Sequence, residues 1–192
     1  MILVVLRFPA IILLAAACVG GCSKPSVVET TADVQEIADS FKLYRPFARA
    51  VQHASRAVLY EGLPHQNWER TTFTNELATK QTVFLCKHPF YSEPLSLSQE
   101  DTDTLRRLYC DSSSFNPFQG HKACGGYHPD YCLEWSNGTK QFLVQFCFGC
   151  HEMKTFSEGQ EHYCEMSSTA FPKFESILKK YRGHRTKDAR EL

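Results

Sequence analysis

The residues with the clearest chemical potential are Cys147, Cys150 and His151, which form a C-x-x-C-H motif. This motif is typical of c-type haem attachment, in which both thiols bond the porphyrin and the histidine ligates its iron. Met166 or His162 would then supply the sixth iron ligand. The motif therefore raises one interpretation, a monohaem c-type cytochrome that transfers electrons.

A structural zinc site is a second interpretation of the same residues. Cys147 and Cys150 have the two-residue gap of a zinc knuckle, and tetrahedral zinc needs two further ligands. If the strand before Cys147 pairs with the one that ends near residue 136, Cys124 lies near Cys150 and His128 lies near Cys147. Cys124 with His128, or with His121, would complete the set.

A disulfide is the third interpretation, with Cys147 or Cys150 bonded to Cys124 or Cys132. Zinc or a disulfide would make the cluster a clasp for the sheet, and we expect one of these two structural forms with no catalytic turnover. We expect either no cofactor or structural zinc, with haem c as the alternative. A thiol oxidoreductase is disfavoured because no helix start follows Cys150 to lower a thiol pKa.

The elements that position these cysteines are predicted from hydrophobic periodicity. Alternating apolar residues over 131–136 and 142–148 flank Asn137 and Gly138, a dipeptide typical of β-hairpins. Pairing Trp135 with Lys140 places the apolar side chains of both strands on one face. Further strands are expected at 152–156 and 82–86.

Helices are predicted elsewhere by apolar residues at helical spacing. They cover 34–41, a stretch from Pro46 to residue 58, a segment that starts at Ser98, and 168–182. Together with the strands they predict an α+β fold, a small and mostly antiparallel sheet with helices packed on one face.

Composition sets the broad class. The chain has 192 residues, 22% charged and 43% apolar, which excludes wholesale disorder and allows a single domain with a real core. Lys and Arg number 21, as do Asp and Glu, so the chain lacks the basic excess of a nucleic-acid binder.

The N-terminus predicts export. An apolar stretch follows Arg7 and has the length of a signal-peptide core, too short to span a bilayer comfortably. The residues that follow, Val19-Gly20-Gly21-Cys22, resemble the lipobox of bacterial lipoproteins, which implies cleavage before Cys22 and acylation of that residue, for example with palmitate. A weaker lipobox that ends at Cys18, an ordinary secretory signal and an uncleaved anchor are alternatives, and all of them imply export.

These signals divide the chain into four parts: 1–21 is a lipoprotein signal peptide, 22–31 a tether, 32–183 a single α+β domain and 184–192 a flexible tail. The membrane is reached through the N-terminal lipid. The expected location is the bacterial cell envelope, an oxidising place in which disulfides form.

Three motifs in the domain resemble a family of uncharacterised bacterial envelope lipoproteins. They are YEGLPH at 60–65, CGGYHPD at 124–130 and CFGC at 147–150. The resemblance spans residues 45–182 and implies a predicted lipoprotein with no assigned activity, substrate or cofactor. We therefore expect a lipid-anchored envelope protein of unknown activity with a structural cysteine cluster.

Overall fold

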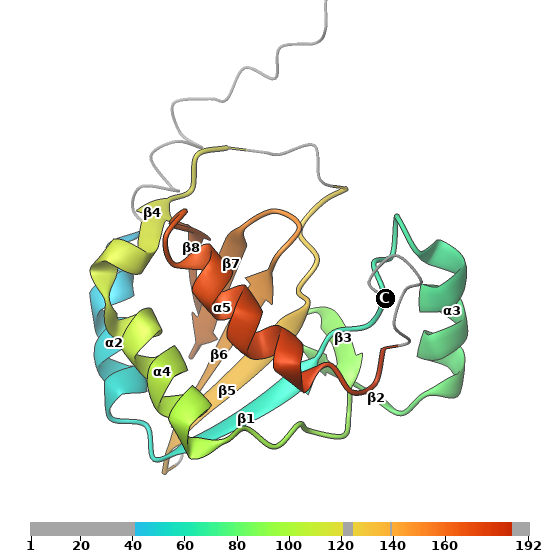
Figure 1. Ribbon diagram of the computed structural model, residues 1–192, viewed down its shortest axis with the longest axis horizontal. Helices are drawn as coiled ribbons and strands as arrows, with labels where there is room; N and C mark the ends of the chain where they lie inside the picture. The colour runs from blue at the N-terminus through green and yellow to red at the C-terminus, as the bar shows by residue number, and fades with distance from the viewer. Residues whose placement is uncertain (1–40, 121–124, 139, 186–192) are drawn as a thin grey trace, which may run out of the picture.

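The computed structural model describes residues 41–120, 125–138 and 140–185. Within these ranges, six strands form an antiparallel sheet in the order β1-β5-β6-β7-β8-β4, and two more form a separate hairpin (Figure 1). The strands are β1 (Arg56–Glu61), β2 (Thr82–Leu85), β3 (His88–Tyr91), β4 (Phe115–Pro117), β5 (Tyr131–Asn137), β6 (Lys140–Cys147), β7 (Glu152–Ser157) and β8 (Gln160–Met166). The helices are α2 (Tyr44–Gln52), α3 (Arg70–Thr79), α4 (Gln99–Cys110) and α5 (Phe171–Leu178), with 3-10 turns at Ser112–Ser114 and Lys179–Tyr181.

Helices α2, α4 and α5 cover one face of the main sheet (Figure 1). Strand residues alternate between two faces, so one set of side chains meets these helices. The core contains Phe47 and Val51 of α2, Leu105 of α4, Phe174 of α5, and Leu133, Trp135, Val144, Phe146 and Met153 of the sheet. The predicted α+β class, with helices on one face of an antiparallel sheet, is confirmed.

The predicted hairpin is present as β5 and β6, but its predicted register is wrong by two residues. Trp135 pairs with Phe142, and Asn137 pairs with Lys140. The pairing continues into Asn137, and Gly138 adopts a φ of 59°, which glycine accepts readily. A shift of two residues keeps each side chain on the same face of the sheet. The prediction that the apolar side chains of both strands share one face is therefore unaffected by the error in register.

The helix predicted from Pro46 to residue 58 is wrong in its second half. Helix α2 ends at Gln52, and Val58 lies in β1, which pairs along its whole length with β5. Six backbone pairs to β5 outweigh the helical spacing of these side chains. The helix that starts at Ser98 and the strands at 82–86 and 152–156 are confirmed as α4, β2 and β7.

Part of the last predicted helix, 168–182, is also corrected. Its regular part is α5, and a 3-10 turn follows. The predicted helix at 34–41 lies outside the described residues except for Phe41. Within residues 41–120, 125–138 and 140–185, each helix falls short of the length and apolar character needed to cross a membrane.

Both outer strands of the main sheet are short or covered. Strand β4 has three residues and ends at Pro117. The free side of β1 forms isolated bridges, Leu59 with Leu95, and Gly62 beyond the strand end with Phe90. The hairpin β2–β3 also contacts the second face of the sheet, because the amide of Gln145 donates to the carbonyl of Leu85 at 2.9 Å.

Candidate functional site

The candidate functional site is a small cavity where three loops meet at one end of the main sheet. One loop follows β1, one precedes β5 and one follows β6, so the sheet brings together segments that are far apart in the chain. The cavity has a volume of about 220 Å³. It is lined by His65, Trp68, His128, Asp130, Cys147, Gly149, Cys150 and Arg185.

Backbone hydrogen bonds hold these loops together beyond the strand ends. The N–H of Gly62 donates to the carbonyl of Asp130 at 2.8 Å, and the N–H of Asp130 donates to the carbonyl of Phe146 at 2.7 Å. A Cβ atom at position 62 would collide with the carbonyl oxygen of Pro129. Glycine is therefore required at position 62 for the first and second loops to approach each other.

His128 has one satisfied and one unsatisfied ring nitrogen. It donates a hydrogen bond to the carbonyl of Leu63, while its Nε2 is buried without a partner among the described residues, so Nδ1 is the donor. The ring of His65 lies 4.6 Å away, centroid to centroid. Burial lowers the pKa of His128 to about 3, with smaller contributions from neighbouring groups that include the guanidinium of Arg185. The imidazole is therefore neutral, and its Nε2 can accept a hydrogen bond or coordinate a cation.

The ring of His65 is held by the turn that follows it. Its Nδ1 accepts the backbone N–H groups of Asn67 at 3.1 Å and Trp68 at 3.3 Å. Its own backbone N–H donates to the carboxylate of Glu69 at 2.8 Å. These bonds fix the imidazole against His128, on the wall of the cavity.

Cys147 and Cys150 differ in chemical state although they line the same cavity. Cys150 is disulfide-bonded. Cys147 is a free thiol, and its sulfur accepts the backbone N–H groups of His128 and Cys150. Burial raises the pKa of Cys147 to about 11, so it is a protonated thiol at neutral pH.

The free thiols among the described cysteines reduce the number of possible partners for Cys150. Cys132 is also free, so the pairings that used Cys147 or Cys132 are wrong. Every other cysteine among the described residues is free, so the partner of Cys150 lies outside them. Cys124, the remaining candidate, lies outside the described residues, as does the predicted lipidation site Cys22.

Arg185 closes the cavity through two carboxylates. Its guanidinium lies 2.6 Å from Glu69 and 3.3 Å from Asp130, and its side chain is 10% exposed. Asp130 also accepts the backbone N–H of Phe148 at 2.8 Å. The three loops and the C-terminal segment are thereby joined by one charged network.

Glu61 anchors the C-terminal segment that carries Arg185. Its buried carboxylate accepts the backbone N–H groups of Gly183, His184 and Arg185 at 3.0, 2.7 and 3.3 Å. We assigned His184 and Arg185 to a flexible tail, and the structure instead holds both against the domain. The expectation of a flexible tail from residue 184 onward hid the role of Arg185.

Two of the residues expected to ligate a haem iron, His151 and Met166, make packing contacts in the structure. The imidazole of His151 stacks on Phe171 with ring centroids 3.7 Å apart, whereas Met166 is buried in the core and 4% exposed. The sulfur of Cys150 is already bonded, so it cannot form a thioether or give zinc a thiolate. Among the described residues, no three His, Cys, Asp or Glu side chains are arranged to hold a metal ion.

Sequence reasoning found His128, Cys147 and Cys150 but overlooked the charged residues of the site. Glu61 and Asp130 stand inside the motifs at 60–65 and 124–130, and the order of those motifs was the available signal. No local pattern pointed to Glu69 or Arg185, because their roles depend on contacts between distant segments.

Comparisons with known proteins gave one structural likeness. No family model matches the chain, and no curated protein matches it. The fold is similar to the crystal structure of a "Putative Lipoprotein from Clostridium perfringens", with 9% sequence identity and a TM-score of 0.40. The match covers 74% of this chain and 94% of the other.

Proposed function

We propose that this chain is a non-catalytic, lipid-anchored protein of the bacterial cell envelope, and that a disulfide between Cys124 and Cys150 clasps its motif loops. The observation that supports the clasp is that Cys150 is disulfide-bonded, whereas Cys147, which lines the same cavity, is a buried free thiol. The sulfur of Cys150 lies 3.8 Å from the carbonyl oxygen of Gly126, two residues from Cys124. This proximity favours Cys124 as the partner.

The charged network supports a structural role for the same region. The guanidinium of Arg185 is paired with Glu69 and Asp130, so these groups satisfy one another without a ligand. Removing one member of such a network leaves the others with uncompensated charge, so its members favour the arrangement in which their segments meet. The disulfide and the network therefore fasten the same loops by two independent means.

The clasp is tested by peptide mapping without reduction and by urea unfolding. We expect a Cys124–Cys150 peptide, and we expect Cys150→Ser to lower the free energy of unfolding by about 2–4 kcal/mol. Cys110→Ser, which removes a half-buried free thiol outside the cavity, should have a much smaller effect. Dithiothreitol should destabilise the wild type and leave Cys150→Ser unchanged.

Opposite results would overturn the clasp. One zinc ion per chain together with a reactive Cys150 would replace the disulfide by a metal site. A Soret band and a haem stain that survives denaturation, after expression with haem-maturation machinery, would restore the cytochrome interpretation.

The lipid anchor is tested at Cys22. Labelling cells with radioactive palmitate should mark the wild type and Cys18→Ser, and should leave Cys22→Ser unlabelled. A label that follows Cys18 instead would move the lipidation site, and the absence of label from every form would contradict the anchor.

A further inference from the structure

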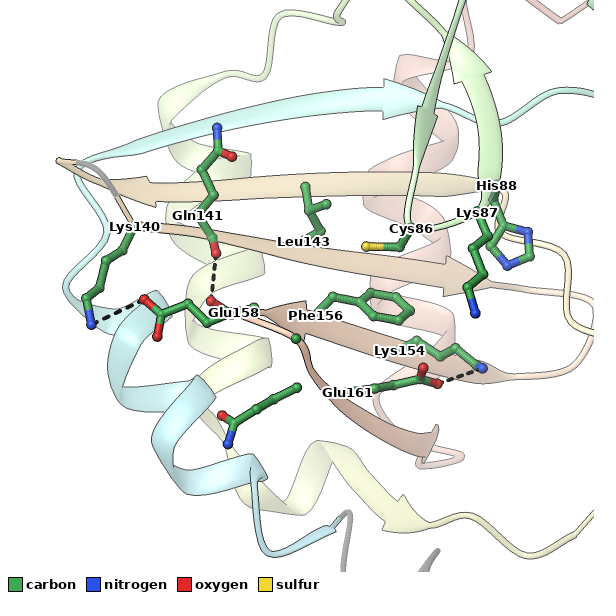
Figure 2. Close-up of a pocket in the computed structure, with 13 residues that line it drawn as sticks. Cys86, Lys87, His88, Lys140, Gln141, Leu143, Lys154, Phe156, Glu158 and Glu161 are labelled. Atoms are coloured by element: carbon green, nitrogen blue, oxygen red, sulfur yellow. Dashed lines mark hydrogen bonds and ion pairs between the residues drawn. The ribbon is translucent and has the colours of Figure 1, made fainter.

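The second face of the main sheet carries a groove that the proposed function does not use. It has a volume of about 580 Å³, within the range of small-molecule sites. Its floor includes Leu143 of β6 and Phe156 of β7, which are directly paired across the two strands and half-buried (Figure 2). The floor is apolar, and the helices lie on the opposite face.

One wall of the groove is the turn between β2 and β3. Cys86 and Lys87 both have left-handed backbone conformations, with φ of 45° and 74°, although neither is glycine. Positive φ at both central residues is what the two-residue turn that closes this hairpin requires. The bond from Gln145 to the carbonyl of Leu85 fixes this turn over the sheet. In Figure 2 the Cys86 sulfur points from the turn over the floor.

The charges around the groove are unequal. Lys140 pairs with Glu158 at 3.5 Å, and Lys154 pairs with Glu161 at 2.7 Å, so both pairs are neutral overall. Lys87 is exposed and has no ion-pair partner among the described residues. Three lysines against two glutamates therefore leave one positive charge, which belongs to the turn.

Lys154 is held too firmly to serve a ligand. Its ammonium lies 4.4 Å above the ring of Tyr163 and 5.0 Å above that of Tyr127, in addition to its bond with Glu161. Lys87 is therefore the cation available to an incoming anion.

We propose that this groove binds an amphiphile with a single anionic head group, with its acyl or aryl body over Leu143 and Phe156 and its head group against Lys87. The apolar body gains by leaving water, and the aliphatic stems of the rim lysines extend the apolar surface. The anionic head supplies the charge that complements the turn. This inference does not depend on the disulfide or on the lipid anchor.

The test uses the full chain with dodecanoate below its micelle concentration. Calorimetry should show one dodecanoate per chain and much weaker binding of dodecyltrimethylammonium, which has the same tail and the opposite charge. Lys87→Glu should weaken dodecanoate binding by about tenfold or more. Lys80→Glu, an exposed lysine that does not line the groove, should leave it unchanged.

The reactivity of the Cys86 thiol tests where dodecanoate binds without the use of any variant. Bound dodecanoate should slow alkylation of Cys86 in the wild type, measured on its peptide by mass spectrometry, while Cys110 outside the groove keeps its rate. Equal affinity for the cationic amphiphile, an unchanged Kd in a folded Lys87→Glu variant, or an unprotected Cys86 would each overturn the proposal.

Discussion

Two regions of this domain bury a histidine, and they do so by different means. In the helix-covered core, His162 lies among the rings of Phe41, Tyr44 and Phe47, with centroids 5.5, 5.9 and 6.3 Å away. It is fully buried, and neither ring nitrogen has a hydrogen-bond partner among the described residues. Burial lowers the pKa of His162 to about 4, so the ring packs as a neutral aromatic group.

At the end of the sheet where the motifs at 60–65, 124–130 and 147–150 meet, here called the motif end, a hydrogen bond holds His128. Its Nδ1 donates to the carbonyl of Leu63, and charged groups surround the cavity beside it. In the core, the histidine ring is held by packing against aromatic rings. At the motif end, hydrogen bonds and ion pairs hold the side chains in place. Substitutions that remove a charge or a hydrogen bond should therefore weaken the motif end most, and acid should act on the core through His162 as well as on the motif end through His128.

The largest effect is expected at Glu61, where the motif end depends on one buried carboxylate. Glu61→Ala leaves the N–H groups of residues 183–185 without their acceptor, and we expect a loss of about 3–5 kcal/mol in the free energy of unfolding. Urea unfolding measures it. Glu158→Ala, an exposed carboxylate, is the control, and an equally small effect for both would contradict the anchoring role.

Acid should destabilise the core through His162. Its folded pKa of about 4 lies below the ordinary value of 6.5, so the unfolded chain takes up the proton first as pH falls. Stability is therefore lost between about pH 6.5 and pH 4, by up to about 3 kcal/mol from this group. Urea unfolding at pH 7 and pH 4.5 measures this loss.

The variant His162→Leu isolates that contribution. It should lose less stability between the two pH values than the wild type, with the remainder due to groups such as His128. His53→Leu, at an exposed position, should behave as the wild type. The same acid sensitivity in His162→Leu would show that the core histidine does not titrate as described.

The smallest effect is expected for Arg185→Lys. Lysine keeps the positive charge but cannot contact Glu69 and Asp130 with two separate nitrogens of a planar fork. We expect a loss of about 1 kcal/mol, measured by urea unfolding. A loss as large as that of Glu61→Ala would mean that the fork, and not the carboxylate anchor, dominates the motif end.

Much of the fold was predictable because its signals are local. The Asn137-Gly138 turn and alternating strands identified β5 and β6, and the acidic start after Ser98 identified α4. The segment around Val58 was misassigned because helical and strand spacing coincide over a few apolar residues. Its strand state is decided by pairing with β5, which is distant in the chain.

Of the residues that form the site, only the cysteines and His128 were predictable from the sequence. The hairpin brought His128 toward Cys147, because strand pairing extends beyond the strand ends. Arg185 was not predictable, because a basic residue near the end of a chain is usually solvated, and its partner Glu69 is more than a hundred residues away. Such a pair has no local pattern.

The edges of the main sheet have a consequence for encounters between copies of this chain. Neighbouring copies that meet side by side could add strand to strand and grow into aggregates. A three-residue outer strand that ends in Pro117, and an opposite strand already bridged by Leu95, offer little backbone for such growth. The two edges of the main sheet therefore disfavour strand addition between copies of the chain.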